Sequence, residues 1–137
     1  MYPTKEQILR KDPSVKQIIL DVVLSWEINQ TQDWSKISNE EKLERLKYLI
    51  VNITMVGHQN QPWPNIIIGD AYYYMPTTMK ICLDRNKPSI ISTLHELGHH
   101  LYGPSELRAC RWSIYLFRTC FPKMYKKLKW SNHLLIK

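Results

Sequence analysis

The sequence lacks any long run of hydrophobic residues. No apolar stretch approaches the roughly 18 residues that a membrane-spanning helix requires, so we expect no membrane segment. The opening residues MYPTKE lead into no apolar region of the kind that signal peptides carry, and we expect no secretion signal. Internal repeats and low-complexity segments are also missing, which excludes repeat architectures. With 137 residues and 44% hydrophobic content, the chain is expected to form one globular domain over residues 1–137.

Cysteine is scarce, and Cys82, Cys110 and Cys120 form no CxxC pair. An odd number of cysteines without regular spacing does not predict a disulfide framework. It indicates reduced thiols and therefore an intracellular, cytoplasmic setting. We interpret Cys110 and Cys120 as small apolar residues of a helix and not as metal ligands.

Acidic residues are outnumbered by basic ones, 12 to 19, which gives a formal net charge of +7 at pH 7. Lysines crowd the C-terminal end, where Tyr125 and Trp130 stand among Lys123, Lys126, Lys127, Lys129 and Lys137. Basic residues interleaved with aromatic ones are compatible with nucleic acid binding. The same pattern is more often a solvated helix face whose aromatic side chains turn inward, and we favour that interpretation.

Hydrophobic periodicity predicts helices in the N-terminal half. Thr4 and Gln7 form a capping-box pattern that begins a first helix, and Asp12-Pro13 ends it. A second, amphipathic helix of about four turns is predicted where apolar residues recur with helical spacing. Its apolar residues are Val15, Ile18, Ile19, Val22, Val23 and Trp26.

A polar segment, 29–36, is predicted to be a loop that leads to a longer helix. Ser38 and Glu41 form a second capping-box pattern at the start of that helix. An apolar stripe with helical spacing then marks a buried face, made of Leu43, Leu46, Leu49, Ile50 and Ile53. We assign these stripes to the core and not to a cofactor site.

The middle of the chain changes to strand-like patterns. A turn-rich segment, 57–64, precedes β-prone runs at 65–69, 72–75 and 79–84, which predict two or three strands. A helix of about three turns follows, with Ser89 as its N-cap and Gly103-Pro104 as its stop. Helices, a small sheet and further helices together predict an α+β fold class.

An HExxH motif, His95-Glu96-Leu97-Gly98-His99, lies inside this last helix. Side chains four residues apart on a helix share one face, so the two imidazoles can ligate one Zn²⁺. Glu96 then lies beside the metal, where it can accept a proton from zinc-bound water as general base. The alternative interpretation is a pair of surface histidines on an amphipathic helix.

A catalytic zinc site needs a third protein ligand, with water in the fourth position. Glu106 is the first candidate, because Ser105 can cap a new helix that doubles back after the Gly103-Pro104 turn. An acidic residue that only interacts favourably with the helix dipole is the alternative for Glu106. His100 points about 100° around the helix from His99, away from the same ion. The remaining candidates are Asp84, His58 and His133.

Residues 79–121 resemble the ImmA/IrrE family of small zincin-type metallopeptidases. In that family a strand and a turn precede an HELGH helix, and a second helix carries a glutamate and a downstream alanine. In this chain the strand is 79–84, the turn is 85–88, and Ser105-Glu106-Leu107-Arg108-Ala109 opens the second helix. The stretch between the motif and that glutamate is short for the family.

The resemblance implies a zincin-like fold with one Zn²⁺ bound by His95, His99 and Glu106, and with Glu96 as general base. In zincins a strand beside the HExxH helix can hold an extended peptide, so the strand near residues 72–83 is the expected edge. A tyrosine is a candidate donor to the oxyanion, with simple packing as the alternative for each of Tyr72, Tyr73, Tyr74 and Tyr102.

These features together predict a zinc-dependent metallopeptidase that acts on an intracellular protein. One alternative is a catalytically weak, zincin-like binding protein that contacts a protein or nucleic acid partner through its basic C-terminal region. Another is hydrolysis of a non-peptide amide. The small size of the chain leaves little room for deep subsites, so we expect a regulatory partner or partial unfolding to present the substrate.

Overall fold

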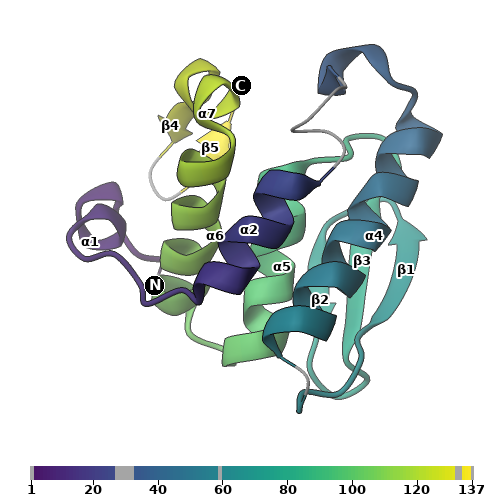
Figure 1. Cartoon of the computed structure of the whole chain (residues 1–137), viewed down its shortest axis with the longest axis horizontal. Coiled ribbons are helices and arrows are strands. Elements are labelled where there is room, and N and C mark those ends of the chain that lie inside the picture. Colours follow the sequence, from purple (N-terminus) through teal and green to yellow (C-terminus); the bar gives the residue numbers. More distant parts are fainter. Residues whose placement is uncertain (1, 27–32, 59, 132–133, 137) are drawn as a thin grey trace.

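The computed structural model describes residues 2–26, 33–58, 60–131 and 134–136 of the 137-residue chain (Figure 1). It has an α+β fold in which helices and a small three-stranded sheet share one hydrophobic core, as the sequence predicts for the fold class. Among the described helices, none has the length and apolar character that crossing a membrane would need.

The first helix, α1 (Lys5–Leu9), confirms the predicted capping box. Thr4 Oγ1 accepts a hydrogen bond from the Gln7 N–H, and Gln7 Oε1 accepts one from the Thr4 N–H. Two backbone donors at the start of the chain's first helix are thereby satisfied. Ile8 is 3% exposed and packs with Cys110 and Ile114 in a small apolar cluster.

The second helix, α2 (Gln17–Ser25), is shorter than the four turns predicted, because it has only 9 residues. Lys16 has extended backbone angles, so the helix begins only after it. The side chain of Lys16 donates a hydrogen bond from Nζ to Gly57 O at 3.0 Å. The apolar period continues beyond the helix because Val15 and Trp26 pack against the same core from its two ends.

The polar segment predicted as a loop is described from Asp33 onward, and residues 29–32 lie outside the described residues. Trp34–Lys36 forms a 3₁₀ turn, η1, and the Asp33 carboxylate caps it by accepting from the Ser35 N–H. The long helix α4 (Asn39–Gly57) follows, with Ser38 as its N-cap, as predicted. The predicted stripe is buried throughout: Leu43, Leu46, Leu49, Ile50 and Ile53.

The sheet consists of β1 (Asn65–Gly69), β2 (Tyr73–Met75) and β3 (Lys80–Asp84), which confirms the three predicted runs. The strand order is β1-β3-β2, and β3 runs parallel to β1 and antiparallel to β2. The central position of β3 explains why its Ile81, Cys82 and Leu83 are buried. The edge predicted near residues 72–83 is therefore β2 alone, because β3 is paired on both sides.

Two helices, α5 (Ile90–Tyr102) and α6 (Glu106–Cys120), pack against each other in the middle of the fold (Figure 1). The predicted bounds of α5 are confirmed, with Ser89 as N-cap and Gly103 as C-cap. Helix α5 also packs against α4 and against strands β2 and β3, so it lies between the sheet and α6.

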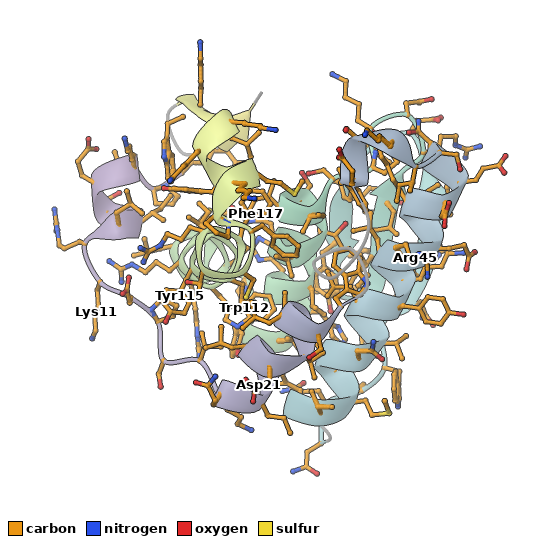
Figure 2. All side chains as sticks on the ribbon, turned by 45° about the horizontal axis from the view of Figure 1, so that its top comes forward. Lys11, Asp21, Arg45, Trp112, Tyr115 and Phe117 are labelled. Carbon is orange, nitrogen blue, oxygen red and sulfur yellow. The ribbon has the colours of Figure 1, made fainter. Side chains whose placement is uncertain are left out.

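The core is built around α5 and α6. Leu94 and Leu97 of α5 are completely buried, and each such leucine contributes about 1.5–3 kcal/mol of hydrophobic stabilisation. Figure 2 shows Trp112 and Phe117 of α6 among the interior side chains, and both are 2% exposed. This packing fixes α5 and α6 relative to each other, and so fixes the side chains that lie between them.

The chain ends in a short helix, α7 (Pro122–Lys127), and an antiparallel pair, β4 (Lys129–Ser131) and β5 (Leu134–Ile136). The aromatic ring of Tyr125 packs edge-on against Phe117. The lysines of this region are exposed, namely Lys123, Lys126, Lys127 and Lys129, while Lys137 lies outside the described residues. At α7 the lysines are thus exposed, and the ring of Tyr125 turns toward the core.

Candidate metal centre

His95 and His99 lie one turn apart on the same face of α5. Their ring centroids are 4.8 Å apart, and the ring planes are nearly perpendicular at 87°. The two side chains are 23% and 11% exposed, so both are mostly buried. This burial does not match the alternative of two ordinary surface histidines.

Glu106, the first residue of α6, reaches back to both histidines. Its Oε2 lies 3.2 Å from His95 Nε2, and its Oε1 lies 2.8 Å from His99 Nε2. One ligand atom from each residue lies within 4.8 Å of the others. In the described part of the chain, this trio is the group of His, Cys, Asp or Glu side chains that can hold a metal ion. The structure brings together the three ligands that the sequence predicts.

The reversal between α5 and α6 depends on Gly103. Its φ of +96° lies in the left-handed region, which residues with a side chain rarely adopt. Ser105 then caps α6, because its Oγ accepts a hydrogen bond from the Arg108 N–H. Glu106 consequently stands in the first turn of α6, where the helix dipole also favours a carboxylate.

The other predicted candidates for a third ligand lie elsewhere. Asp84 accepts a hydrogen bond from the backbone N–H of Asn86 at 2.8 Å. His100 is 8% exposed, and its Nε2 donates to Pro62 O at 2.7 Å. His133 lies outside the described residues. None of the described candidates belongs to the cluster around Glu106.

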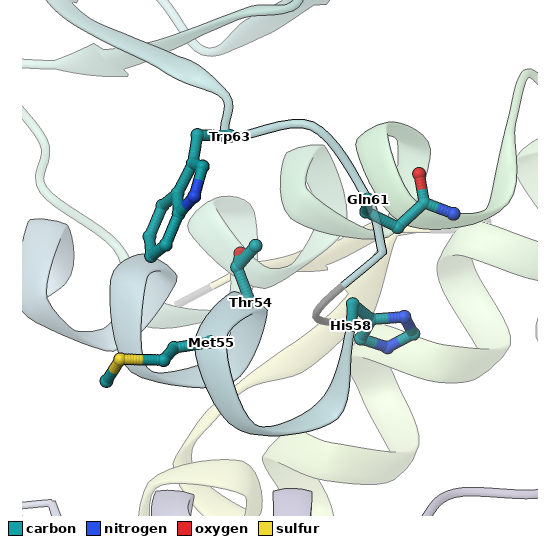
Figure 3. A pocket seen from close by; sticks show the side chains of 5 residues that line it. All are labelled: Thr54, Met55, His58, Gln61 and Trp63. Atoms are coloured by element: carbon teal, nitrogen blue, oxygen red, sulfur yellow. The ribbon is translucent and has the colours of Figure 1, made fainter.

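His58 also lies apart from the cluster, at the end of α4. Its Nε2 is 3.1 Å from the Tyr102 hydroxyl, and partial burial lowers its pKa, with smaller electrostatic contributions from Lys16 and His100. The imidazole borders a surface hollow of about 180 Å³, which is lined by Thr54, Met55, His58, Gln61 and Trp63 (Figure 3).

A backbone carbonyl fixes the tautomer of His99. Gly103 O can only accept, so His99 Nδ1 must donate to it across 3.0 Å. Nε2 is therefore the ring nitrogen that is left to bind a metal, and it faces Glu106. Metal-ligating histidines are usually oriented by a hydrogen bond of this kind from the other ring nitrogen.

The corresponding atom of His95, Nδ1, lies 3.8 Å from Cys110 Sγ. The sequence interpretation assigned Cys110 to core packing, which its 2% exposure supports, but missed this contact. Helical spacing carries a signal for it, because Cys110 lies four residues after Glu106 and therefore on the same face of α6.

Glu96 lies beside the ligands in a buried position. It is 8% exposed, and its Oε1 is 4.0 Å from His95 Nε2. Burial raises the pKa of Glu96 to about 7, which the neighbouring His99 opposes and the carboxylate of Glu106 reinforces. A carboxyl group with a pKa near neutrality can both accept and return a proton at physiological pH.

Gly98, in the middle of the motif, allows α5 and α6 to approach closely. A Cβ atom at this position would lie 3.3 Å from Trp112 Cε3 and 3.4 Å from the Cα of Ala109. The first separation is tighter than most real Cβ contacts, and the second is an ordinary van der Waals contact. The glycine therefore brings the helix that carries Glu106 within reach of the two histidines.

The tyrosines considered as oxyanion donors are largely engaged elsewhere. Tyr72 Oη accepts a hydrogen bond from the N-cap N–H of α5 at 2.8 Å. Tyr74 donates to His100 Nδ1 at 2.9 Å, since the other ring nitrogen of His100 is already a donor. Tyr102 lies against His58, and Tyr73 is 39% exposed on the far side of β2. Packing is thus the better account of Tyr72, Tyr74 and Tyr102.

The donor set of the cluster fits zinc. Two imidazole nitrogens and one carboxylate are the ligands of many catalytic zinc sites, at bond lengths of about 2.0–2.2 Å. Magnesium and calcium prefer all-oxygen sites, which this cluster does not offer. Both histidines present Nε2 toward Glu106, so the three donors converge on one point between α5 and α6.

No family model, curated protein or solved structure matches the chain. The resemblance of residues 79–121 to the ImmA/IrrE family stays an expectation from sequence. The candidate metal centre is supported by the positions of His95, His99 and Glu106 themselves.

Proposed function

We propose that the protein is a zinc-dependent metallopeptidase of zincin-like architecture, similar to the ImmA/IrrE family, that hydrolyses peptide bonds of a cytoplasmic protein. The observation that carries the proposal is the position of Glu106, whose two oxygens face His95 and His99 at 3.2 and 2.8 Å. Glu96, buried next to this cluster, supports catalysis rather than binding alone, because a buried carboxyl group is costly to keep without a task.

The chain's own residues divide the chemistry among them. A bound Zn²⁺ would supply Lewis acidity, which lowers the pKa of a water molecule and polarises the scissile carbonyl. Glu96 would take the proton of the attacking water on Oε1, the oxygen nearer His95, and return it to the leaving amine. The hydrogen bond from His99 to Gly103 O holds that imidazole in its ligating orientation throughout.

An extended peptide is the substrate shape that suits this architecture. In the described sheet, β2 is paired with β3 on one side only, and an edge strand can bind a peptide as an additional strand. Tyr74 ties β2 to α5 through His100, so the edge keeps a fixed distance from the helix that carries the motif. Tyr73 and Met75 alternate with Tyr74 and are exposed, and their side chains are available to contact a substrate.

Zinc content and peptidase activity test the proposal together. The purified protein is expected to hold about one zinc per chain. His99→Ala and Glu106→Ala are expected to lose it, because each removes one of three ligands. Glu96→Gln is expected to keep the metal and lose at least ~100-fold in turnover, since it removes only the general base.

His58→Gln is the matched control, because it changes a histidine that the structure places outside the cluster. It should keep both zinc and activity. A wild-type protein that binds no zinc after metal is added back, or a Glu96→Gln protein with full peptidase activity, contradicts the proposal. If the protein hydrolysed small amides but no proteins, the substrate would be a non-peptide amide and not a peptide.

A second candidate function, binding of nucleic acid, is favoured by one observation. The exposed lysines of α7 and β4 lie close together in sequence and structure: Lys123, Lys126, Lys127 and Lys129. Phosphate contacts through such lysines would make the affinity for nucleic acid fall steeply with salt. Binding that is unchanged between low and high salt would exclude this role.

A further inference from the structure

We propose that basic residues of α1, α7 and β4 form one surface, the basic face, which selects protein substrates that carry an acidic segment near the scissile bond. The basic face consists of six exposed residues: Lys5, Arg10, Lys11, Lys123, Lys126 and Lys129. The inference deepens the proposed function and, for its effect on cleavage, rests on it. Binding of an acidic peptide needs neither metal nor catalysis, so the two proposals can be tested apart.

The positive charge of the protein is concentrated in its two terminal segments. Residues 1–16 and 106–137 together hold 12 basic and 3 acidic residues, a net charge of +9. The 89 residues between them hold 7 basic and 9 acidic residues, a net charge of −2. A surface that gathers charge of one sign in this way raises the local concentration of partners of the opposite sign and speeds their association.

The fold brings these two segments together. Arg111 of α6 donates two hydrogen bonds to Gln7 O of α1, at 3.2 and 2.7 Å. Lys5 Nζ lies 5.6 Å from the centre of the Trp130 ring in β4, within the range of a cation–π contact. Figure 1 shows α1 beside α6, with α7 and β4 at the C-terminal end of α6. One side of the molecule therefore carries basic residues from both segments.

Acidic side chains do little to neutralise this face. The terminal segments contain Glu6, Asp12 and Glu106. Asp12 pairs with Arg118, which is not one of the six residues of the basic face. Glu106 faces the two histidines of the candidate metal centre. Glu6 is the one that stands on α1 among the exposed basic residues, so the face keeps a positive balance.

The basic face borders the candidate metal centre. Ile8 of α1 packs with Cys110, whose Sγ lies 3.8 Å from His95 Nδ1. Leu107, which packs against the same apolar cluster, directly follows Glu106. Packed helices lie about 8–10 Å apart, so roughly 10–20 Å, or about three to six residues of extended peptide, separate the metal centre from the exposed side of α1. The acidic segment is expected at that spacing from the scissile bond.

Nucleic acid is the other polyanion that a basic face can bind. Proteins that bind single strands also stack the bases on aromatic rings. Here Tyr125 packs against Phe117, and Trp130 packs against the small apolar cluster beneath Lys5, so these rings are engaged within the protein. Together with the position beside the metal centre, this favours an acidic segment of a protein substrate.

Peptide binding tests the basic face without catalysis. The probes are fluorescent peptides of about 20 residues that share one unstructured centre and carry a flank of four Glu, four Gln or four Lys. Their affinity for the Glu96→Gln protein is measured by fluorescence anisotropy. Each surface ion pair contributes roughly a factor of two, so the Glu peptide is expected to bind about tenfold more tightly than the Gln peptide. Salt at about 0.5 M should remove most of this preference by screening.

Charge reversal locates the preference on the surface. Arg10→Glu/Lys11→Glu changes two residues of the basic face, and Figure 2 shows Lys11 pointing away from the body of the protein. Lys47→Glu/Lys87→Glu is the matched control, because it makes the same change in net charge at two exposed or half-exposed positions on α4 and before α5. The first variant should bind the Glu peptide no more tightly than the Gln peptide, and the control should keep the preference.

Cleavage by the zinc-loaded protein measures the consequence for specificity. We expect kcat/KM for the Glu peptide to exceed that for the Gln peptide about tenfold, mainly through KM, because the flank lies away from the reacting bond. Arg10→Glu/Lys11→Glu should bring the two peptides to the same kcat/KM without lowering kcat.

Equal binding of the three peptides, or an equal loss of preference in the control, overturns the inference, and the proposed function stands if the peptides are still cut. A preference for the Glu peptide without any cleavage overturns the proposed function and leaves the basic face as a site for acidic protein. Tighter binding of an oligothymidine of about 20 nucleotides, competing with the Glu peptide, would assign the face to nucleic acid and overturn the inference.

Discussion

The histidine outside the metal cluster, His100, shows how single residues set the frame of the site. Its Nε2 donates to Pro62 O and its Nδ1 accepts from the Tyr74 hydroxyl, so one buried imidazole joins the loop before β1, strand β2 and helix α5. Both ring nitrogens are used, which fixes the neutral tautomer of a side chain that is only 8% exposed. The sequence shows two adjacent histidines, and the structure gives them separate tasks.

Removing the Tyr74 hydroxyl is expected to destabilise the fold. In Tyr74→Phe the buried Nδ1 of His100 loses its donor, which costs about 1–3 kcal/mol. Tyr73→Phe is the matched control on the same strand, because Tyr73 is 39% exposed, and it should stay within about 0.5 kcal/mol of wild type. Urea unfolding of the three proteins measures both values. Equal stabilities for the two variants would mean that the bond to His100 contributes nothing.

At the scale of elements, the candidate metal centre is a property of the α5–α6 pair. All three proposed ligands lie on these two helices, and the separation of the helices decides whether Glu106 reaches the histidines. Gly98 sets that separation, because a larger residue would contact Trp112 and Ala109 across the interface. The motif position that carries no side chain therefore also contributes to the geometry of the site.

Gly98→Leu is expected to weaken zinc binding and to lower stability by about 1–3 kcal/mol, because the inserted side chain forces α5 and α6 apart. Leucine is a better helix former than glycine by about 1 kcal/mol, so helix propensity alone would raise the stability and offsets part of this loss. Gly98→Ala, the smaller insertion, should have a smaller effect on zinc affinity. Chelator competition and urea unfolding measure the two effects, and wild-type zinc affinity in Gly98→Leu would contradict the role assigned to the glycine.

Local signals in the sequence predicted much of this architecture. Ser89, Ser105 and Gly103 mark helix ends because capping and a positive φ depend on the residue itself. The position of Glu106 could also be predicted locally, because a helix that follows a turn as short as Gly103-Pro104 can double back along the one before it. The length of α2 was misjudged, because its flanking residues pack against the core without being helical. Helical spacing places Cys110 on the same face of α6 as Glu106, but its contact with His95 depends on how α5 and α6 pack, which no local pattern encodes.

At the scale of the whole molecule, a metal held between two helices is expected to stabilise the fold. Zinc that binds the folded chain more tightly than the unfolded chain adds about 2.7 kcal/mol at a free concentration 100-fold above its Kd. We expect zinc to raise the melting temperature by on the order of 10 °C relative to chelator-treated protein. Calorimetry measures this shift. Glu106→Ala is the control, and a similar shift in that variant would place the stabilising metal elsewhere.

The contacts that hold α1 in place span almost the whole chain. Arg111 donates to Gln7 O from Nε and Nη2 at 3.2 and 2.7 Å, across 104 residues, and Arg118 pairs with Asp12 across 106. During synthesis at about 5–20 residues per second, Ile8 leaves the ribosome several seconds before the partners that bury it exist. The proposed metal ligands, by contrast, are made almost together. The chain therefore completes the candidate metal centre late and within a short interval, and covers Cys110 with the segment that it made first.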